Sequence, residues 1–308
     1  MIKKDIIIYY PSFEKGGATI NLINFANLSS KRNNVYLISN INNKDKRNFF
    51  SKQINLYKIS NFSFKLISNR LITSLLSIYN MIKIFNKIGS KNSIIVSFQS
   101  HIVSIFICKI FGRKIIIRNS EDVLGATKYA DYKIFAYLVM FLKTIFYFLS
   151  DAIITNSKKA KNSLQKITFY KKKIDLIYNP YLIKIKKIKS KKRKNIILSV
   201  GRLCKQKNQE LLIKAFSIFL KKYPDYKLVL IGHGADKVKL ANVCNNLKIM
   251  NKVEFKGWLT NPNYYYENSK LFVFPSLYEG LPNALIDSVN NELPCISSKC
   301  SGAEDILT

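Results

Sequence analysis

The sequence predicts an α/β protein made of two doubly wound, Rossmann-like domains that face each other across a central cleft. Short runs rich in β-branched residues alternate with longer amphipathic runs along the 308 residues, which is typical of parallel sheets covered by helices. The alternation breaks once, at a dense basic segment, and then restarts. Ligands of such folds bind outside the carboxyl ends of the strands, so we expect the site in the cleft.

The first domain is expected to span residues 1–180 and to contain six strands and five helices. The strands are expected at Asp5–Tyr10, Val35–Ser39, Ile94–Gln99, Lys114–Asn119, Asp151–Ser157 and Ile174–Tyr178. The helices are expected at Ala18–Asn27, Leu66–Lys87, His101–Phe111, Tyr132–Leu149 and Lys158–Lys166. Residues 39–64 show no clear period and have no assignment.

A basic linker is expected at residues 181–194, because Asn179-Pro180 ends the sixth strand and Lys184 to Lys194 is a charged run. A surface loop within one domain is the alternative. The second domain then covers residues 195–308. Its strands are expected at Asn195–Val200, Lys227–Ile231, Val253–Lys256, Leu271–Phe274 and Cys295–Ser298. Its helices are expected at Gln209–Lys222, Lys237–Leu247 and from Asn283 to about Asn291.

The charge balance is strongly basic, with 51 Lys and Arg against 18 Asp and Glu, or +33. This excess attracts anionic partners but does not choose between a membrane surface and a nucleic acid. Nucleic acid is not expected, because the sequence shows neither a recognised module nor aromatic residues interleaved with the basic ones. The apolar segment Ile134–Leu149 is interrupted by Lys143 and falls short of the roughly 20 residues that span a bilayer. A buried or membrane-grazing helix is expected there.

The cysteines and the N-terminus indicate a reducing, cytoplasmic setting. The five cysteines form no C-x-x-C pair and have no His at metal-ligand spacing, so we expect reduced thiols and no metal site. The N-terminus runs from Lys3-Lys4-Asp5 directly into a strand, without the apolar region of a signal peptide. A cytoplasmic protein is expected, peripheral on the inner face of the membrane if its charge brings it there.

Two cations follow the first strand of the second domain. Gly201 allows a sharp turn off the strand, and Arg202 and Lys207 follow it. Arg offers a planar fork and Lys a point charge, which together suit a diphosphate. Ordinary surface cations on a loop are the alternative. Gly232, at the end of the next strand, permits either a ligand's close approach or a tight turn.

The most informative segment is the loop after strand Leu271–Phe274. Glu279 precedes Gly280 and Leu281, and a helix then begins at Asn283. The N–H groups of these last three residues lack intrahelical partners and can donate to anionic or hydroxylated ligand groups. Glu279 could accept from sugar hydroxyls. Asp287, about one turn into the helix, could accept from ribose hydroxyls, or it could simply be an acidic residue that the helix dipole favours near the helix start.

Over nearly its whole length, the sequence resembles family 4 of the GT-B glycosyltransferases. The motifs that carry the resemblance are Gly16-Gly17-Ala18, Asp151–Ser157, Ile177-Tyr178-Asn179, Gly201-Arg202-Leu203 with Lys207-Asn208-Gln209, and the loop of Glu279 and Asp287. They occur in the family's order and on the expected elements. The resemblance implies a retaining transferase that uses a UDP- or GDP-linked sugar, with no cofactor and no metal. The acceptor would be a glycan or a lipid-linked precursor in surface polysaccharide or lipooligosaccharide assembly, bound by the first domain.

The resemblance also implies roles for individual residues. Arg202 and Lys207 would bind the donor diphosphate and stabilise the leaving charge, and Glu279 would contact the donor sugar. Gly16, Gly17, Gly201, Gly232, Gly280, Leu281 and Asn283 would line the donor site. Asp287 stands where the family usually has Glu, one methylene longer. The chain stops at Thr308, where family members usually continue with a helix that returns to the first domain, so a truncated member is expected, and a weak or inactive version is the alternative to an active one.

The first domain offers fewer candidates. His101 follows a strand and is expected to face the cleft, with either a catalytic or a structural role. Arg118 and Glu121 are similarly placed. The alternatives to a transferase are a GT-B epimerase or hydrolase, an inactive remnant that binds a nucleotide, and a basic nucleic-acid-binding protein.

Overall fold

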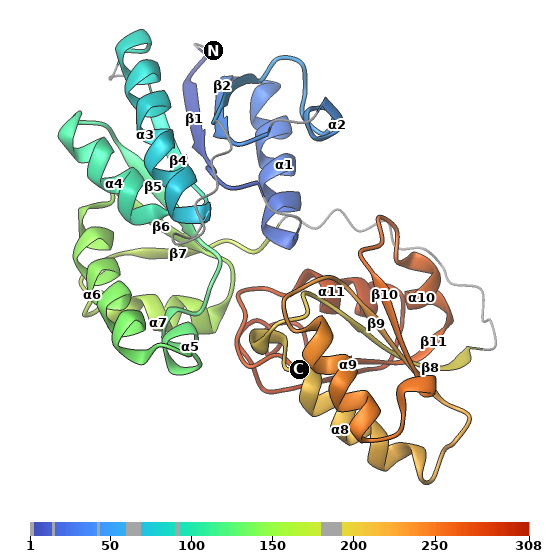
Figure 1. Ribbon diagram of the computed structural model, residues 1–308. Helices are drawn as coiled ribbons and strands as arrows, with labels where there is room; N and C mark the ends of the chain where they lie inside the picture. Colours follow the sequence, from blue (N-terminus) through green and yellow to red (C-terminus); the bar gives the residue numbers. More distant parts are fainter. Residues whose placement is uncertain are drawn as a thin grey trace. The chain divides into compact units, whose positions relative to one another are not determined.

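The structure contains two parallel sheets, and the β-branched runs of residues 1–180 form the strands of the first. The computed structural model describes residues 3–13, 16–41, 44–59, 69–89, 93–179 and 193–307. Its contacts divide the chain into two compact units, Met1–Pro180 (unit 1) and Tyr181–Thr308 (unit 2), and each is considered by itself (Figure 1).

Unit 1 is built on a seven-stranded sheet in the order β3-β2-β1-β4-β5-β6-β7, with every neighbouring pair parallel. The strands are β1 (Asp5–Tyr9), β2 (Asn34–Ser39), β3 (Asn55–Lys58), β4 (Ser93–Ser97), β5 (Ile115–Asn119), β6 (Ala152–Thr155) and β7 (Ile174–Leu176). The helices are α1 (Gly17–Ser30), α2 (Lys44–Arg47), α3 (Asn69–Lys87), α4 (His101–Ile110), α5 (Val123–Lys128), α6 (Lys133–Leu149) and α7 (Lys158–Ile167).

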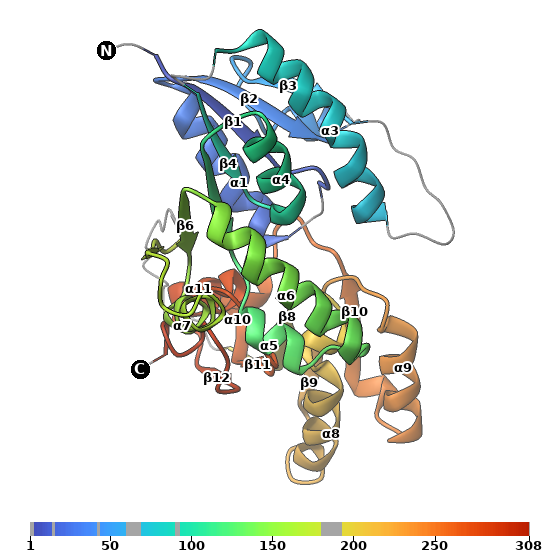
Figure 2. The same ribbon diagram turned by 90° about the vertical axis from the view of Figure 1, so that its left-hand side faces the viewer.

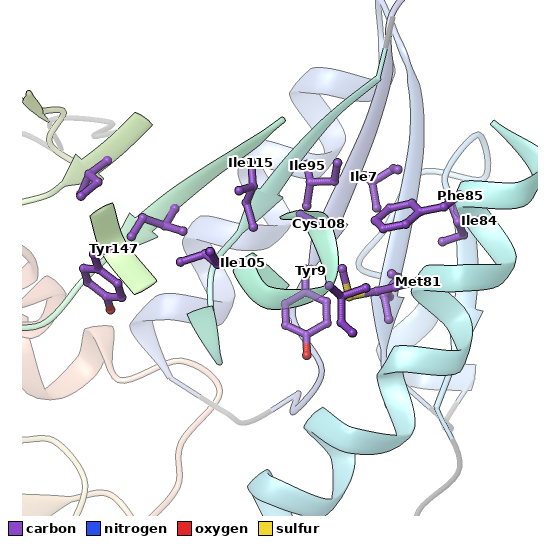
Figure 3. Close-up of a cluster of buried hydrophobic side chains, with 14 of the residues drawn as sticks. Ile7, Tyr9, Met81, Ile84, Phe85, Ile95, Ile105, Cys108, Ile115 and Tyr147 are labelled. Atoms are coloured by element: carbon purple, nitrogen blue, oxygen red, sulfur yellow. The ribbon is translucent and has the colours of Figure 1, made fainter. Parts of the chain in front are cut away.

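Alternation along β1 divides the core of unit 1 between the two faces of the sheet. Ile7 and Tyr9 point into the larger cluster, which includes Met81 of α3 (Figure 3). Ile8 packs on the opposite face, in a cluster with Leu22 of α1. Helices α3, α4 and α6 therefore form a layer on one face, as Figure 2 shows, and α1 covers the other.

Helix α6 is exposed, so of the two expected alternatives, a buried or a membrane-grazing helix, the buried one is wrong. Of its 17 residues, all within the described part of the chain, Tyr147 alone is buried. Ile134 is 89% exposed and Phe141 60% exposed. None of the helices in the described ranges is long and apolar enough to cross a membrane.

Unit 2 carries a five-stranded parallel sheet in the order β10-β9-β8-β11-β12. The strands are β8 (Lys194–Val200), β9 (Lys227–Ile231), β10 (Val253–Gly257), β11 (Ser269–Phe274) and β12 (Cys295–Ser297). The helices are α8 (Gln209–Leu220), α9 (Lys237–Asn246), α10 (Asn263–Asn268) and α11 (Asn283–Asn290), with short 3-10 turns η1 (Lys205–Lys207) and η2 (Met250–Lys252). One apolar cluster lies on each face of this sheet, and neighbouring residues of β8 contribute to them, Ile197 to one and Leu198 to the other.

The two-sheet α/β architecture is confirmed, and the differences lie in short elements and at element ends. The sequence did not predict α2, β3, α5 or α10. Leu66 and most of the expected linker lie outside the described residues. Lys194, assigned to that linker, begins β8, and Arg193 donates to four carbonyls of unit 2, at Tyr266, Ser269, Asn291 and Glu292.

Candidate functional site

The carboxyl ends of β8 and β9 are held together by backbone contacts that leave no room for side chains. Gly201 N–H donates to the Ile231 carbonyl at 2.9 Å. Gly232 has φ +144°, and a Cβ there would lie 1.9 Å from the Gly201 carbonyl oxygen. A Cβ on Gly234 would lie 2.0 Å from the Leu203 oxygen. Gly232 was predicted to permit a ligand's approach or a tight turn, and the structure shows that it makes room for the Gly201 carbonyl.

The turn after β8 is fixed to the loop after β11. Leu277 N–H donates to the Gln206 carbonyl at 2.8 Å, and Gln206 Nε2 donates to the Tyr278 carbonyl at 2.9 Å. Asn208 adopts φ +51° between η1 and α8, which reverses the chain after Lys207. Two segments about 70 residues apart in sequence thus form one surface at the carboxyl edge of the sheet.

Lys207 and Glu279 meet on this surface as a partly buried ion pair. Lys207 Nζ donates to Glu279 Oε1, and their side chains are 16% and 11% exposed. The ammonium also lies 5.0 Å from the ring centroid of Phe274, at the end of β11. Restricted access to water strengthens both interactions and holds the ammonium in place.

Arg202 precedes Lys207 on the same loop. Its side chain is exposed and makes no hydrogen bond or ion pair with the residues that the structure describes. Its carbonyl is held by Gln209 Nε2 at 2.7 Å, so the backbone is fixed while the guanidinium extends into solvent. A fixed Lys and an extended Arg on one loop are suited to an anion with several oxygens.

Helix α11 begins next to Glu279 without a side-chain cap. Pro282 occupies the N-cap position and offers none, and the N–H groups of Gly280 and Leu281 donate to no described residue. Gly302 packs beneath this loop with φ +76°, where a Cβ would lie 1.7 Å from the Gly280 carbonyl oxygen. These donors and the helix dipole favour a negative or hydroxylated ligand at the start of α11.

Asp287, one turn into α11, has a carboxylate without a hydrogen-bond or ion-pair partner among the described residues. Burial raises the pKa of this carboxyl to about 6. A half-buried acceptor without a partner is suited to a ligand hydroxyl. In the described ranges, no group of three or more His, Cys, Asp or Glu side chains could hold a metal ion.

The remaining candidates lie in unit 1, which is considered by itself. Gly16 and Gly17 lie at the start of α1, where Gly16 is extended and a Cβ would meet nothing within 4 Å. Packing therefore gives no reason for glycine at position 16. The five cysteines are all free thiols.

His101 begins α4, and its Nδ1 hydrogen-bonds Ser97 Oγ at 2.9 Å while its ring lies edge-on to Tyr147. These contacts orient the imidazole from within unit 1. Arg118 is buried, which lowers its pKa to about 10, and it donates to Ser120 and to Asn179. Glu121 pairs with Lys143 of α6 at 3.3 Å.

Sequence reasoning gave no role to the residues that support the loops of unit 2. Gln206 and Gln209 join the β8 turn to its neighbours through amide hydrogen bonds, and Gly302 underlies the Glu279 loop. A Gly near the end of an irregular segment was the one available signal, and it does not reveal which backbone lies above it.

Comparison with known proteins identifies the family of unit 2. Residues 182–308 match the family model described as glycosyl transferases group 1. This unit belongs to that family. The resemblance predicted from the sequence is thereby confirmed.

Relatives and solved structures agree with this assignment. An uncharacterized glycosyltransferase of Methanocaldococcus jannaschii is 33% identical over 187 residues, 56% of this chain and 46% of that protein. An N-acetylgalactosamine-N,N'-diacetylbacillosaminyl-diphospho-undecaprenol 4-alpha-N-acetylgalactosaminyltransferase of Campylobacter jejuni is 31% identical over 208 residues, 65% of this chain and 55% of that protein. The chain thus spans about half the length of the curated relatives it matches.

The crystal structure of Anabaena HepE in complex with UDP and glucose superposes with a TM-score of 0.76 at 17% identity and covers 99% of this chain and 83% of HepE. At that identity the likeness shows the fold, which is GT-B.

Proposed function

We propose that this chain acts as a retaining glycosyltransferase, moving a hexose-type sugar from a nucleoside-diphosphate sugar to a glycan or lipid-linked acceptor. The observation that supports this most directly is the placement of Lys207, Glu279 and the free guanidinium of Arg202 on adjoining loops of a group 1 domain. The name of the Campylobacter jejuni relative includes a diphospho-undecaprenol acceptor, which favours a lipid-linked acceptor in surface polysaccharide or lipooligosaccharide assembly.

The residues of unit 2 would bind the donor in three parts. Arg202 and Lys207 hold the diphosphate, the α11 start and Glu279 contact the sugar, and Asp287 accepts from the ribose hydroxyls. HepE binds UDP in its crystal structure, so UDP-linked donors are the first to test, ahead of GDP-linked ones. The proposal needs no cofactor and no metal ion.

In the proposed reaction, the bond between the sugar's C1 and the β-phosphate oxygen breaks as the acceptor oxygen bonds to C1 from the same face. The bonding pair leaves with the nucleoside diphosphate, whose oxygen takes the acceptor's hydroxyl proton. Arg202 and Lys207 stabilise the charge that develops on the departing phosphate, Lys207 from a position already fixed by Glu279 and Arg202 from the same loop. Glu279 keeps the Lys207 ammonium oriented throughout.

The test is turnover with a panel of UDP- and GDP-linked sugars and lipid-linked glycan acceptors, with release of the nucleoside diphosphate as the readout. We expect release with one donor class, an α-configured product by NMR from an α-linked donor, and at least a hundredfold loss in Arg202→Ala. Lys221→Ala, at the far end of α8, is the matched control and should retain activity. An inverted product would exclude the retaining mechanism, and equal activity of both variants would exclude the proposed site.

A further inference from the structure

The outer side of the α3–α4–α6 layer in unit 1 exposes an unusual amount of apolar surface. We call this surface the apolar face and define it by the exposed apolar residues of these helices. They are Leu75, Leu76, Tyr79, Phe106, Ile110, Ile134, Phe135, Tyr137, Leu138, Phe141, Ile145 and Leu149. A soluble monomer rarely exposes so many large apolar side chains together, and such a face marks a binding surface.

Contacts between the helices place the three helices of the apolar face side by side. Helices α3 and α4 pack on each other, as do α4 and α6 (Figure 2). Phe106 of α4 contacts Phe146 of α6, with ring centroids 6.3 Å apart. On α6, Ile134, Leu138 and Phe141 follow one another at helical spacing, so they project from one side of the helix.

The positive charge of these three helices favours an anionic partner for the apolar face. Helices α3, α4 and α6 contain six Lys and Arg and no Asp or Glu. On α3, Lys83 and Lys87 continue the stripe of Leu75 and Tyr79 at four-residue intervals. Both lysines are exposed and form no ion pair among the described residues.

The larger part of the chain's net charge lies on the same unit. Residues 1–180 hold 29 Lys and Arg against 8 Asp and Glu, a net +21, whereas residues 181–308 hold 22 against 10, a net +12. A second copy of the chain would bring two such units together against their mutual repulsion. A nucleic acid would gain little from exposed Ile and Leu side chains, which neither stack on bases nor neutralise phosphates.

We propose that the apolar face inserts into the surface of an anionic lipid bilayer. Ile, Leu and Phe side chains would enter the boundary between headgroups and acyl chains, and Tyr79 and Tyr137 would lie at the headgroup level, where tyrosine is favoured. Lys83 and Lys87 would contact the acidic headgroups, with their aliphatic stems along the apolar surface. The inference goes beyond sugar transfer and would stand if the chain were inactive.

The test is co-sedimentation of the full chain with vesicles of phosphatidylcholine alone or with added phosphatidylglycerol. We expect binding to the anionic vesicles at low salt, weakened several-fold at 0.5 M salt, and little binding to neutral vesicles. The double variant Ile134→Asp/Phe141→Asp should bind at least a hundredfold more weakly, because each residue contributes about tenfold or more. Lys83→Glu/Lys87→Glu should lose most of the preference for phosphatidylglycerol.

The matched control is Ile218→Asp/Val238→Asp, two apolar residues of unit 2 that are 69% and 71% exposed. This control should bind vesicles like the unchanged chain. All four sites are exposed, so circular dichroism and melting temperature should be unchanged in both double variants. Because the assay contains no nucleotide, its outcome is separate from that of the turnover test.

Three results would overturn the proposal. They are absence of binding to anionic vesicles at low salt, equal loss of binding in the apolar-face variant and the control, and a concentration-dependent dimer in sedimentation velocity that Ile134→Asp/Phe141→Asp abolishes. The last result would assign the apolar face to a second copy of the chain.

Discussion

Replacing Glu279 by Gln removes the charge of the Lys207–Glu279 pair while keeping its shape. Both side chains are mostly buried, at 16% and 11% exposed, so the ammonium of Lys207 would lose its counter-ion in a place where water only partly replaces it. Exposed pairs contribute about 0–1 kcal/mol, and breaking a fully buried pair costs about 3–5 kcal/mol. For this intermediate burial, we expect unit 2 to lose about 2–3 kcal/mol of unfolding free energy.

Trp258 makes this loss measurable in unit 2 alone. It is the single tryptophan of the sequence and follows β10 in unit 2, so its fluorescence during urea unfolding reports on that unit. A double-mutant cycle with Lys207→Met separates the pair from its surroundings. Removing both charges should cost clearly less than the sum of the single changes. Additive costs, or a Glu279→Gln change below about 0.5 kcal/mol, would refute the assignment of a stabilising, positioned ammonium.

Two further changes probe the loops around this pair. Asp287→Asn should stabilise unit 2 by about 2–3 kcal/mol at pH 8 and by little at pH 4, because burial raises the pKa of Asp287 to about 6 and folded-state stability is lost as pH rises from about 4 through 6. The same urea titration at the two pH values checks this, and an equal gain at both would contradict it. Gly232→Ala should destabilise by at least about 3 kcal/mol, since its Cβ would meet the Gly201 oxygen at 1.9 Å. Gly16→Ala, where a Cβ meets nothing within 4 Å, should cost less than about 1 kcal/mol; similar melting temperatures for the two variants would count against the packing account.

Much of the fold could be predicted because its strands are buried and β-branched. Strand β9 was predicted at its observed bounds, Lys227–Ile231, and most other elements differ by one to three residues at their ends. The misses have physical causes. Strand β3 has only four residues, none of them buried, so it lacks the apolar pattern on which the prediction depends. Helix α10 is six residues long and dominated by tyrosine and asparagine.

Burial was harder to predict than secondary structure. From the sequence alone, α6 was expected to be either buried or membrane-grazing, because both kinds of helix have the same pattern of apolar residues on most sides. The packing of unit 1, where Tyr147 is the buried residue of α6, excludes the buried alternative.

The site could be predicted as a set of residues but not as an arrangement. Lys207 and Glu279 were both candidates, yet their contact depends on the hydrogen bonds that join the Gln206 turn to the loop after β11. Likewise, Gly232 was expected to make room for a ligand or a turn, and what it accommodates is the Gly201 carbonyl. Such contacts between distant segments leave no local signal in a single sequence.

The central claim is that Arg202 and Lys207 form a nucleoside-diphosphate site in unit 2, and thermal unfolding with UDP, GDP, ADP, CMP and a short oligonucleotide tests it most directly. The account predicts that one diphosphate raises the melting temperature by several degrees, that Arg202→Ala abolishes this shift, and that Lys221→Ala keeps it. Stabilisation by the oligonucleotide but by no nucleotide, or an unchanged shift in Arg202→Ala, would contradict it.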